Sequence, residues 1–463
     1  MKIDLNSLRS SLESLRDQPD RLIEIILQQA ERMVEMEAEI SALKQRLSDL
    51  EQKPPGSTAP FRIEDRKRVS NPKKPGRKGG HKGSYRKALV ETEQITIPLT
   101  CCPNCGGELE DIQAVKQIIE EIPPVKLRVV GLTTFKGCCA QCGEVRSTHP
   151  LQVSTAVGAA GVHLGPNALS ILLQFQHSWH LTKRKSCQIL DQLFGLSITP
   201  GGLVSATHRL AKKLKDNYQA LKEQARSAAV LHSDETSWYV GRPGHTLWVF
   251  TNAALTLYRV VRTRNRDELQ ETVGKNFSGV LLSDCLSIYD DATPIQHKCY
   301  SHHLKAISKA IGQHPQGESG FLNEVKVLLK TAMTIKDLKH QTAPETYQQW
   351  CEHLEKRADA LLLTQPRRQP QEEAVRKRLF KQRDHLFTFL YHDQVDATNN
   401  LAERQLRPAV IARKISCGNR TPKGAETWEI LASLATTCAQ TGQSFGELIT
   451  KALTLDPTPG LAR

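Results

Sequence analysis

Apolar residues recur along the first fifty positions with a spacing that alternates between four and three. This heptad seam runs over Leu22, Ile26, Gln29, Met33, Met36, Ile40, Leu43, Leu47 and Leu50. Such a repeat predicts a coiled coil within residues 1–52, in which the polar Gln29 fixes the register. A single amphipathic helix packed on its own domain is the alternative. The acidic outer face and the Pro- and Gly-rich segment behind it favour the coiled coil, and with it a homodimer or a higher oligomer.

The periodicity changes after residue 226, where short apolar runs replace the helical pattern. Residues 228–234, 246–251, 256–262 and 279–284 are typical of strands, and a polar helix over 266–274 precedes the last of them. Three strands, a helix and a fourth strand are the opening order of an RNase-H-like α/β core. Helical patterns over 321–331, 346–363 and 371–391 then predict a helical insertion before the chain returns to this core.

Residues 165–225 have a helical pattern throughout. The segments 182–194 and 200–214 have the outline of a helix-turn-helix, with Thr199 as N-cap and Pro200 as the first helical residue. The outline fits DNA reading and ordinary three-helix packing equally well. We therefore predict a multidomain α+β fold with these parts: coiled coil 1–52, basic arm 53–90, zinc ribbon 91–150, helical DNA-binding domain 151–226, RNase-H-like core 227–295 and 393–440, helical insertion 296–392, and C-terminal tail 441–463.

Positive charge is spread unevenly along the chain. The formal net charge is +14, yet residues 1–52 hold 7 Lys or Arg against 11 Asp or Glu. Residues 62–87 carry 11 basic residues against 2 acidic ones, which favours an arm along nucleic acid over a merely solvated tether. We expect its DNA contacts at Lys73, Lys74, Arg77, Lys78 and Lys82. The sequence has no run of 18 apolar residues and no apolar signal core, so we expect a soluble, cytoplasmic protein without a membrane partner.

Six of the twelve cysteines lie in two tight clusters. Each cluster contains a pair of cysteines with two residues between them and a glycine directly after the second cysteine. Two such knuckles predict one structural Zn²⁺ in a four-thiolate zinc ribbon, whose strands we place at 118–130 and 132–135. The neighbouring Cys101 or Cys138 could each replace the adjacent thiolate, and His149 is a weaker substitute. The predicted ligands are Cys102, Cys105, Cys139 and Cys142.

Two of the predicted strands end in a carboxylate, Asp234 in the first and Asp284 in the fourth. Adjacent strand ends lie side by side in a sheet, so the two acids would form a negative pocket that a cation neutralises. An aspartate after a strand is also ordinary turn chemistry, and neither residue alone indicates a site. A third carboxylate from a later helix would complete a two-metal site suited to phosphoryl transfer on DNA.

The candidate third carboxylate is Glu403, near the start of a predicted helix. Asn399, Asn400, Glu403 and Arg407 are three or four positions apart and share one helix face. We expect the acid to hold metal while the amides and the guanidinium meet phosphate or the other carboxylates. Earlier in the chain, Cys299 and His302 form a Cys-x-x-His sequence. It fits active-site support and a core cysteine with a surface histidine equally well.

Together these motifs resemble the insertion sequence 66 family of DDE transposases. The resemblance covers nearly the whole chain, and the Asn-Asn-x-Ala-Glu-Arg block is its most specific part. The matching motifs are His232-Ser233-Asp234-Glu235-Thr236, Leu282-Ser283-Asp284 with Tyr289, Thr398 to Pro408, Arg413-Lys414, Gly424-Ala425-Glu426 and Ser433-Leu434.

The resemblance implies that Asp234, Asp284 and Glu403 are a catalytic triad holding two Mg²⁺ (or Mn²⁺) ions. It implies cutting at transposon ends and joining of the 3′-OH ends to target DNA, with accessory proteins of the same element as further partners. We expect DNA-bound protein at the bacterial nucleoid. Two other functions remain open: an RNase-H-fold nuclease without strand transfer, and an inactive zinc-dependent DNA-binding regulator. Basic residues expected to meet DNA near the triad are Arg404, Arg407, Arg413 and Lys414.

Overall fold

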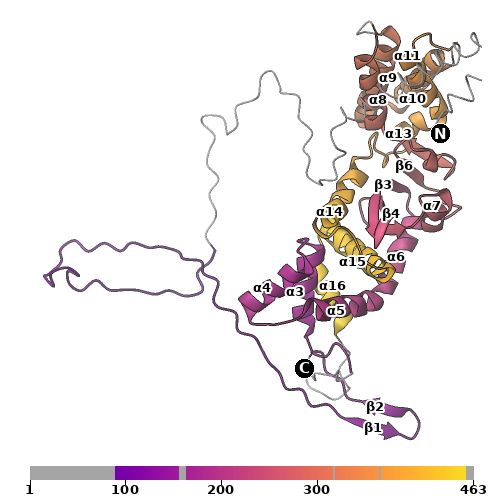
Figure 1. Cartoon of the computed structure of the whole chain (residues 1–463). Helices are drawn as coiled ribbons and strands as arrows, with labels where there is room; N and C mark the ends of the chain where they lie inside the picture. Colours follow the sequence, from indigo (N-terminus) through magenta and orange to yellow (C-terminus); the bar gives the residue numbers. More distant parts are fainter. Residues whose placement is uncertain (1–88, 156–162, 316–318, 364–365, 455–463) are drawn as a thin grey trace, which may run out of the picture. The chain divides into compact units, whose positions relative to one another are not determined.

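The computed structural model describes residues 89–155, 163–315, 319–363 and 366–454 (Figure 1). The chain divides into two compact units, residues 1–118 and residues 119–463. In the first unit, the described residues 89–118 form no helix or strand. The predicted coiled coil over 1–52 and nearly all of the basic arm over 53–90 lie outside the described residues.

The second unit begins with a small antiparallel hairpin of β1 (Lys136–Cys139) and β2 (Gly143–Arg146). The strands predicted over 118–130 and 132–135 are wrong, because no strand forms there. Ile119 and Val129 illustrate the reason, with exposed fractions of 80% and 84%. Their β-branched side chains suit a strand, but a strand also needs a partner for its backbone groups. Pairing begins only at Lys136.

Four helices follow, and the second and third of them begin at a capping threonine. The Thr182 hydroxyl accepts a hydrogen bond from the Lys185 amide (3.3 Å), and the Thr199 hydroxyl accepts one from the Gly202 amide (3.1 Å). Between the two helices Gly195 adopts a φ of 63°, a left-handed conformation that glycine takes at no steric cost. The helix-turn-helix outline is present as α4 and α5. The helices are α3 (Pro166–His177), α4 (Lys183–Phe194), α5 (Pro200–Lys213) and α6 (Lys215–Arg226).

A five-stranded mixed sheet forms the centre of this unit, in the order β5-β4-β3-β6-β7. The strand β4 is antiparallel to both of its neighbours, whereas β3, β6 and β7 run parallel. Four of the strands agree with the predicted ones, and α7 agrees with the predicted polar helix. The elements are β3 (Val230–Val240), β4 (Arg242–Thr251), β5 (Thr256–Val261), α7 (Arg266–Val273), β6 (Val280–Ser283) and β7 (Ile295–Lys298).

Both faces of the sheet are buried, which explains the continuous apolar run in β4. Leu247 and Val249 point into a core shared with α14 (Asn400–Ser416) and α15 (Pro422–Thr441). Trp248 and Phe250 point the other way, into the larger core that contains residues of α3 to α7. Alternate residues of one strand thus serve two cores. Helix α14, which carries Glu403, lies directly on β3 and β4.

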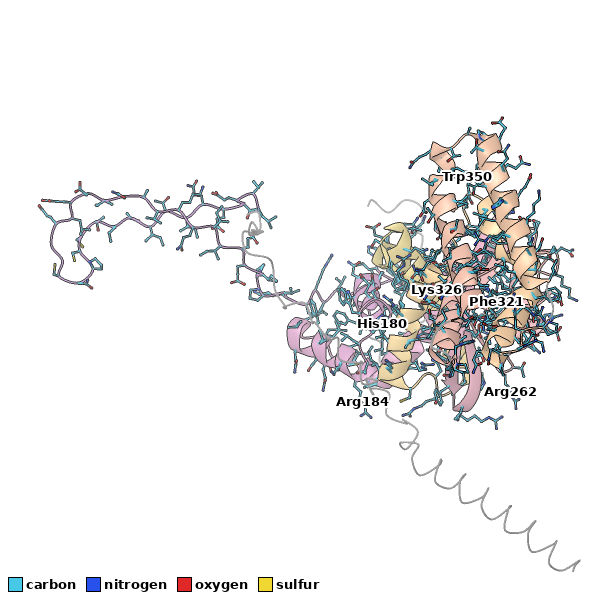
Figure 2. The ribbon with its side chains drawn as sticks, turned by 90° about the horizontal axis from the view of Figure 1, so that it is seen from above. His180, Arg184, Arg262, Phe321, Lys326 and Trp350 are labelled. Carbon is cyan, nitrogen blue, oxygen red and sulfur yellow. The ribbon has the colours of Figure 1, made fainter. Side chains whose placement is uncertain are left out.

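A group of helices lies between β7 and α14 in the sequence. Its core joins Leu322, Leu354 and Leu379 to sheet residues such as Leu282. Phe321 and Lys326 belong to α9 and Trp350 to α10, as Figure 2 shows. None of the described helices is both long enough and apolar enough to span a bilayer. The helices are α8 (Tyr300–Gly312), α9 (Gly320–Leu338), α10 (Pro344–Leu362), α11 (Pro370–Lys381), α12 (Arg383–Leu386) and α13 (Thr388–Tyr391).

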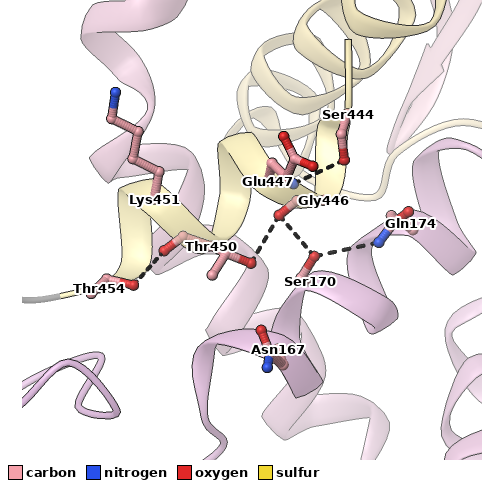
Figure 3. Close-up of a pocket in the computed structure, with 9 residues that line it drawn as sticks. All are labelled: Asn167, Ser170, Gln174, Ser444, Gly446, Glu447, Thr450, Lys451 and Thr454. Atoms are coloured by element: carbon pink, nitrogen blue, oxygen red, sulfur yellow. Dashed lines mark hydrogen bonds between the residues drawn. The ribbon is translucent and has the colours of Figure 1, made fainter. Parts of the chain in front are cut away.

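The last helix, α16 (Phe445–Leu453), packs closely against α3 at Gly446. A Cβ at this position would lie 2.7 Å from Gln174 Nε2, so a larger residue would have to displace the flexible end of the Gln174 side chain. The Gly446 carbonyl accepts hydrogen bonds from Ser170 (3.0 Å) and Thr450 (2.9 Å), as Figure 3 shows. These bonds lie beside a cavity of about 700 Å³, and most of its lining groups are neutral. Its polar atoms bind one another, which is typical of a packing seam between helices.

Candidate active site

The register of two parallel strands brings the two aspartates together. The first three residues of β3 pair with the β6 residues fifty positions later, as in Val230 with Val280 and His232 with Leu282. Continued by two residues, this register aligns Asp234 with Asp284, which directly follows β6. The strand β3 itself continues to Val240, so the predicted end of this strand at Asp234 is wrong. The Asp284 side chain also accepts a hydrogen bond from the Leu286 amide (3.0 Å), which holds it at the turn after β6.

Asp234 has an environment that disfavours its charged form. Burial, followed by the negative charges of Asp284 and Glu403, raises its pKa to about 6. The Glu235 amide donates to Asp234 Oδ1 (2.8 Å) and His302 lies near enough to act in the opposite direction, but neither compensates. The carboxylates of Asp284, directly after β6, and of Glu403, on α14, therefore both lie within electrostatic reach of Asp234 on β3.

Glu403 belongs to the first turn of α14, and its side chain is exposed. The buried face of the same helix presents Ala402, Leu406 and Ala409 to the core over β3 and β4. Small side chains at these positions allow the helix to lie close to the sheet. The spacing of the buried residues therefore determines the direction in which Glu403 projects.

The start of α14 is fixed by Asn399, whose side chain is almost fully buried. Its amide donates to the Ser233 carbonyl (2.7 Å), and its amide oxygen lies 3.1 Å from His232 Nδ1. The Asn399 backbone amide donates to Cys299 Sγ (3.1 Å). The sequence predicted that the side-chain amide of Asn399 meets phosphate or a carboxylate. In the structure this side-chain amide is bound to β3 instead.

Cys299 and His302 lie beside the acids. Burial opposes ionisation of the Cys299 thiol, but hydrogen bonds from His302 and from the Asn399 amide lower its pKa overall. The same bond to Cys299, together with the charges of Asp284 and Glu403, raises the pKa of His302. The cysteine is fully buried and the histidine half-buried, so the pair closes one side of the acidic cluster.

Glu235 is a further buried acid whose role the sequence did not indicate. Burial raises its pKa to about 7, although the Tyr289 hydroxyl donates to it over 2.5 Å and Arg264 lies 3.3 Å away. It follows Asp234 on β3, so its side chain points to the opposite face of the sheet. Tyr289 is fully buried and also lies 3.2 Å from Ser233 Oγ. These bonds stiffen β3 immediately beside Asp234.

Lys298 on β7 is a second residue that the sequence did not single out. Its side chain is fully buried, and its ammonium donates to Ser283 Oγ over 3.3 Å. Burial lowers its pKa to about 8, opposed by the charges of Asp290, Cys285 and Asp284. A cation is therefore buried close to the acidic end of β6. Its only sequence signal would have been a lysine inside a strand, and the polar run Gln-His-Lys concealed that strand.

The basic residues of α14 have different positions. Arg404, Arg407 and Lys414 are exposed, as is Asn400. Arg413 instead turns back onto β3, where its guanidinium donates hydrogen bonds of 2.8 Å to the hydroxyls of Thr236 and Ser237. The predicted DNA contacts of the arm lie outside the described residues. They are Lys73, Lys74, Arg77, Lys78 and Lys82.

The first cysteine knuckle is a tight turn around one sulfur. The amides of Asn104 and Cys105, followed by the Cys105 side chain, lower the pKa of Cys102. Gly106 has a φ of 76° and its amide donates to the Cys102 carbonyl (2.8 Å). Amides directed at a sulfur stabilise a thiolate, which is the form that binds metal.

The second knuckle repeats this local structure at the tip of the β1–β2 hairpin. The amides of Gln141 and Cys142, followed by the Cys142 side chain, lower the pKa of Cys139. Gly143 has a φ of 74° and pairs with Cys139 in the hairpin register. Two segments far apart in the sequence thus have the same turn.

No metal cluster is assembled by the side chains described: no group of three or more His, Cys, Asp or Glu among them could hold an ion. The first knuckle belongs to the unit 1–118 and the second to the unit 119–463. The zinc site therefore stays a prediction. The acids Asp234, Asp284 and Glu403 are oxygen donors of the kind that Mg²⁺ prefers, and the raised pKa of Asp234 indicates a cluster that a cation would stabilise.

Comparison with known proteins gives one result for this region. The family model described as Transposase IS66 family matches residues 161–427, more than half of the chain. The match spans β3, β6 and the start of α14, and so includes all three acids. No curated protein matches the chain. The chain belongs to the IS66 family of transposases.

Proposed function

We propose that this transposase cuts the ends of its element and joins the freed 3′-OH ends to target DNA, with Asp234, Asp284 and Glu403 as its catalytic acids. One observation carries the proposal: burial, followed by the charges of Asp284 and Glu403, raises the pKa of Asp234 to about 6. Three acids from separate elements that repel one another need a counter-charge, and a divalent cation supplies it. Buried acids with a strongly raised pKa are common in functional sites of proteins.

The three acids would hold two Mg²⁺ (or Mn²⁺) ions, which when bound activate the attacking oxygen and stabilise the leaving oxygen. Arg404 and Arg407 are exposed on the helix that carries Glu403 and would offset the charge of the reacting phosphate. Asn399 is a positioning residue, because it acts through β3 and α14. Cys299 and His302 support the same junction. No protein nucleophile is required.

An RNase-H-like core, formed by residues 227–295 and 393–440, is part of this proposal. Its support is the strand order β5-β4-β3-β6-β7 with three parallel strands. Asp284 directly follows the carboxyl end of β6, and Asp234 lies two residues beyond the last pair between β3 and β6. Ligands of open α/β sheets bind at the carboxyl ends of the strands. Residues 296–392 would contain an insertion, because helices α8 to α13 lie between β7 and α14 in the sequence and pack on one another as well as on the sheet.

The further partners belong to the proposal as well. The helices α4 and α5 would contact duplex DNA, and the arm over residues 62–87 would follow its phosphates.

Zn²⁺ held by Cys102, Cys105, Cys139 and Cys142 would stabilise the ribbon. The amides directed at Cys102 and Cys139 support this proposal. The coiled coil would make a homodimer or higher oligomer, and accessory proteins of the element would join it at the nucleoid. Transposon ends are cut in pairs, which requires two active sites.

Cleavage of a duplex carrying one end of the element tests the proposal. We expect Mg²⁺-dependent cuts by the parent protein and none by Asp234→Asn, Asp284→Asn or Glu403→Gln, while duplex binding is retained. Asp337→Asn changes an exposed acid on α9 and serves as the matched control. Normal cleavage by any one of the three variants would remove that residue from the site.

The products separate the other two functions. Cuts without joined products, at any target concentration, would indicate a nuclease of the same fold. Duplex binding without any cut by the parent protein, in Mg²⁺ or Mn²⁺, would indicate a DNA-binding regulator.

A further inference from the structure

A second cavity, of about 530 Å³, lies where α5 and the start of α6 meet the first turns of α15. None of the three acids lines it, so it is separate from the candidate active site. Its base is formed by Ala211 and Ile430, which are buried, and by the buried Thr427. His208 Nδ1 lies 2.6 Å from the Thr427 hydroxyl and ties α5 to α15. The walls of the cavity are therefore held in place.

The rim of this cavity carries mostly positive charge. Arg209, Lys212, Lys215 and Lys423 line it against the single carboxylate of Glu426. Lys215 lies 3.2 Å from Glu426, but both side chains are more than half exposed, so this pair contributes little. For the other three basic residues no ion pair is found among the residues that the structure describes.

Two further observations indicate that this charge lacks a counter-ion. Burial, followed by the positive charges of Lys423 and Lys183, lowers the pKa of His208. Helix α15 also directs its N-terminal end here and has no acidic residue in its first turn. The positive end of a helix dipole thus adds to the lysine and arginine charges. An anion in the cavity would relieve all of these repulsions together.

We propose that this cavity binds the phosphate backbone of duplex DNA and holds it against α5 without reading its bases. The identity of the polyanion rests on the proposed function; the preference for phosphate rests on the cavity. Long flexible cations and helix N-termini are typical phosphate ligands, and phosphate contacts set the register of a protein on DNA. Because α5 is the second helix of the α4–α5 pair, the cavity would anchor DNA beside that pair.

The test compares two triple variants of the full-length protein. Arg209→Gln, Lys212→Gln and Lys423→Gln remove charge from the cavity. Lys330→Gln, Lys356→Gln and Arg357→Gln remove the same charge from exposed positions on α9 and α10. Binding of a short labelled duplex is measured by fluorescence anisotropy over a range of salt concentrations, without divalent metal. Thermal unfolding checks that both variants are folded.

We expect the cavity variant to bind the duplex at least about tenfold more weakly than the parent. The slope of the logarithm of the binding constant against the logarithm of the salt concentration should be smaller in magnitude by roughly 2–3. The control variant should bind like the parent. Equal losses in both variants would mean that only the overall charge matters, and unchanged binding by the cavity variant would overturn the proposal directly. A duplex-binding defect would be seen whether or not the protein cleaves, so it is independent of the catalytic proposal.

Two further outcomes would assign the cavity to another ligand. Inorganic pyrophosphate should compete with duplex for the parent more than for the cavity variant. Calorimetric binding of pyrophosphate that the variant loses, with duplex affinity unchanged, would indicate a site for a free phosphate compound instead. Normal duplex binding with weaker self-association in sedimentation would indicate a protein-docking surface. Either result would contradict DNA binding at this position.

Discussion

The side-chain amide of Asn399 donates a hydrogen bond to the Ser233 carbonyl over 2.7 Å, one residue before Asp234 on the strand. The same asparagine begins α14, whose first turn carries Glu403 four residues later. One buried amide thus connects the backbone that carries the first acid to the helix that carries the third. This bond therefore contributes to the relative positions of Asp234 and Glu403.

The first prediction concerns this bond. Asn399→Ala should lower the free energy of unfolding by about 1–3 kcal/mol, because it leaves the buried Ser233 carbonyl without a partner. End cleavage should fall as well, since α14 loses its attachment to β3. Urea unfolding and the cleavage assay measure the two effects. Asn400→Ala, at the exposed neighbouring position, should change stability by no more than about 0.5 kcal/mol. Equal stability of both variants would show that the bond contributes nothing.

The second prediction concerns pH. The pKa of Asp234 is raised from 3.8 to about 6, so the folded protein binds this proton more tightly than the unfolded chain does. The resulting stability is fully present below pH 3.8 and is lost as the pH rises through 6. Asp234→Asn removes that loss and should therefore be more stable than the parent at pH 8, by about 1–3 kcal/mol. At pH 5 the difference should shrink.

Adding a divalent cation tests the same prediction in a second way. Mg²⁺ should raise the melting temperature of the parent at pH 8 and have less effect on Asp234→Asn, because the cation replaces the missing counter-charge. Asp337→Asn should behave like the parent in both respects. A parent protein that is more stable than Asp234→Asn at pH 8 without metal would contradict the assigned direction.

The third prediction concerns zinc. Purified protein should contain about one zinc per chain, held by four thiolates. Cys102→Ser combined with Cys139→Ser should release the zinc, because each substitution removes a sulfur to which the backbone amides of the turn donate hydrogen bonds. Cys101→Ser combined with Cys138→Ser is the matched control and should retain the metal. Metal analysis after gel filtration decides, and retention in the first variant would exclude the predicted ligand set.

The fourth prediction concerns assembly. Deleting residues 1–52 should leave a folded protein that self-associates more weakly, because the heptad seam from Leu22 to Leu50 would no longer pair chains. Ile40→Lys combined with Leu43→Lys should have the same effect in the full-length chain. Sedimentation equilibrium measures both. If either variant sediments like the parent, the assembly device has to lie elsewhere, and the exposed Trp350 on α10 would be the next position to test.

The sequence predicted those elements whose local signals agree with their packing. The helix α5 begins at the predicted cap Thr199, α4 begins one residue after the predicted start at Thr182, and β3, β4, β5 and β6 coincide with apolar runs. The strand β7 was not predicted, because Gln296, His297 and Lys298 are polar although all three are fully buried. The opposite error occurred before Lys136, where an apolar run found no strand partner. Burial of a side chain depends on the tertiary structure, which periodicity does not contain.

The candidate site was predictable to the same extent. Asp234, Asp284 and Glu403 were identifiable because each stands at the end of an apolar run in the sequence or on a distinctive helix face. The roles of Glu235 and Lys298 were not, since they depend on a tyrosine hydroxyl and a serine hydroxyl that come close only in the fold. The sequence also assigned Asn399 to the ligand side of the site, whereas its hydrogen bonds stabilise the protein.

The chain leaves the sheet after Lys298 and returns at Ala397, and these two points touch. The Ala397 carbonyl accepts a hydrogen bond from the Tyr300 amide (2.9 Å) and lies 3.3 Å from His297 Nε2. A long excursion that starts and finishes at one place adds little closure entropy, and its length enters only logarithmically. The length of the excursion could therefore vary without displacing Glu403, provided that the helices packed on Leu282 and the start of α8 beside Asn399 are kept.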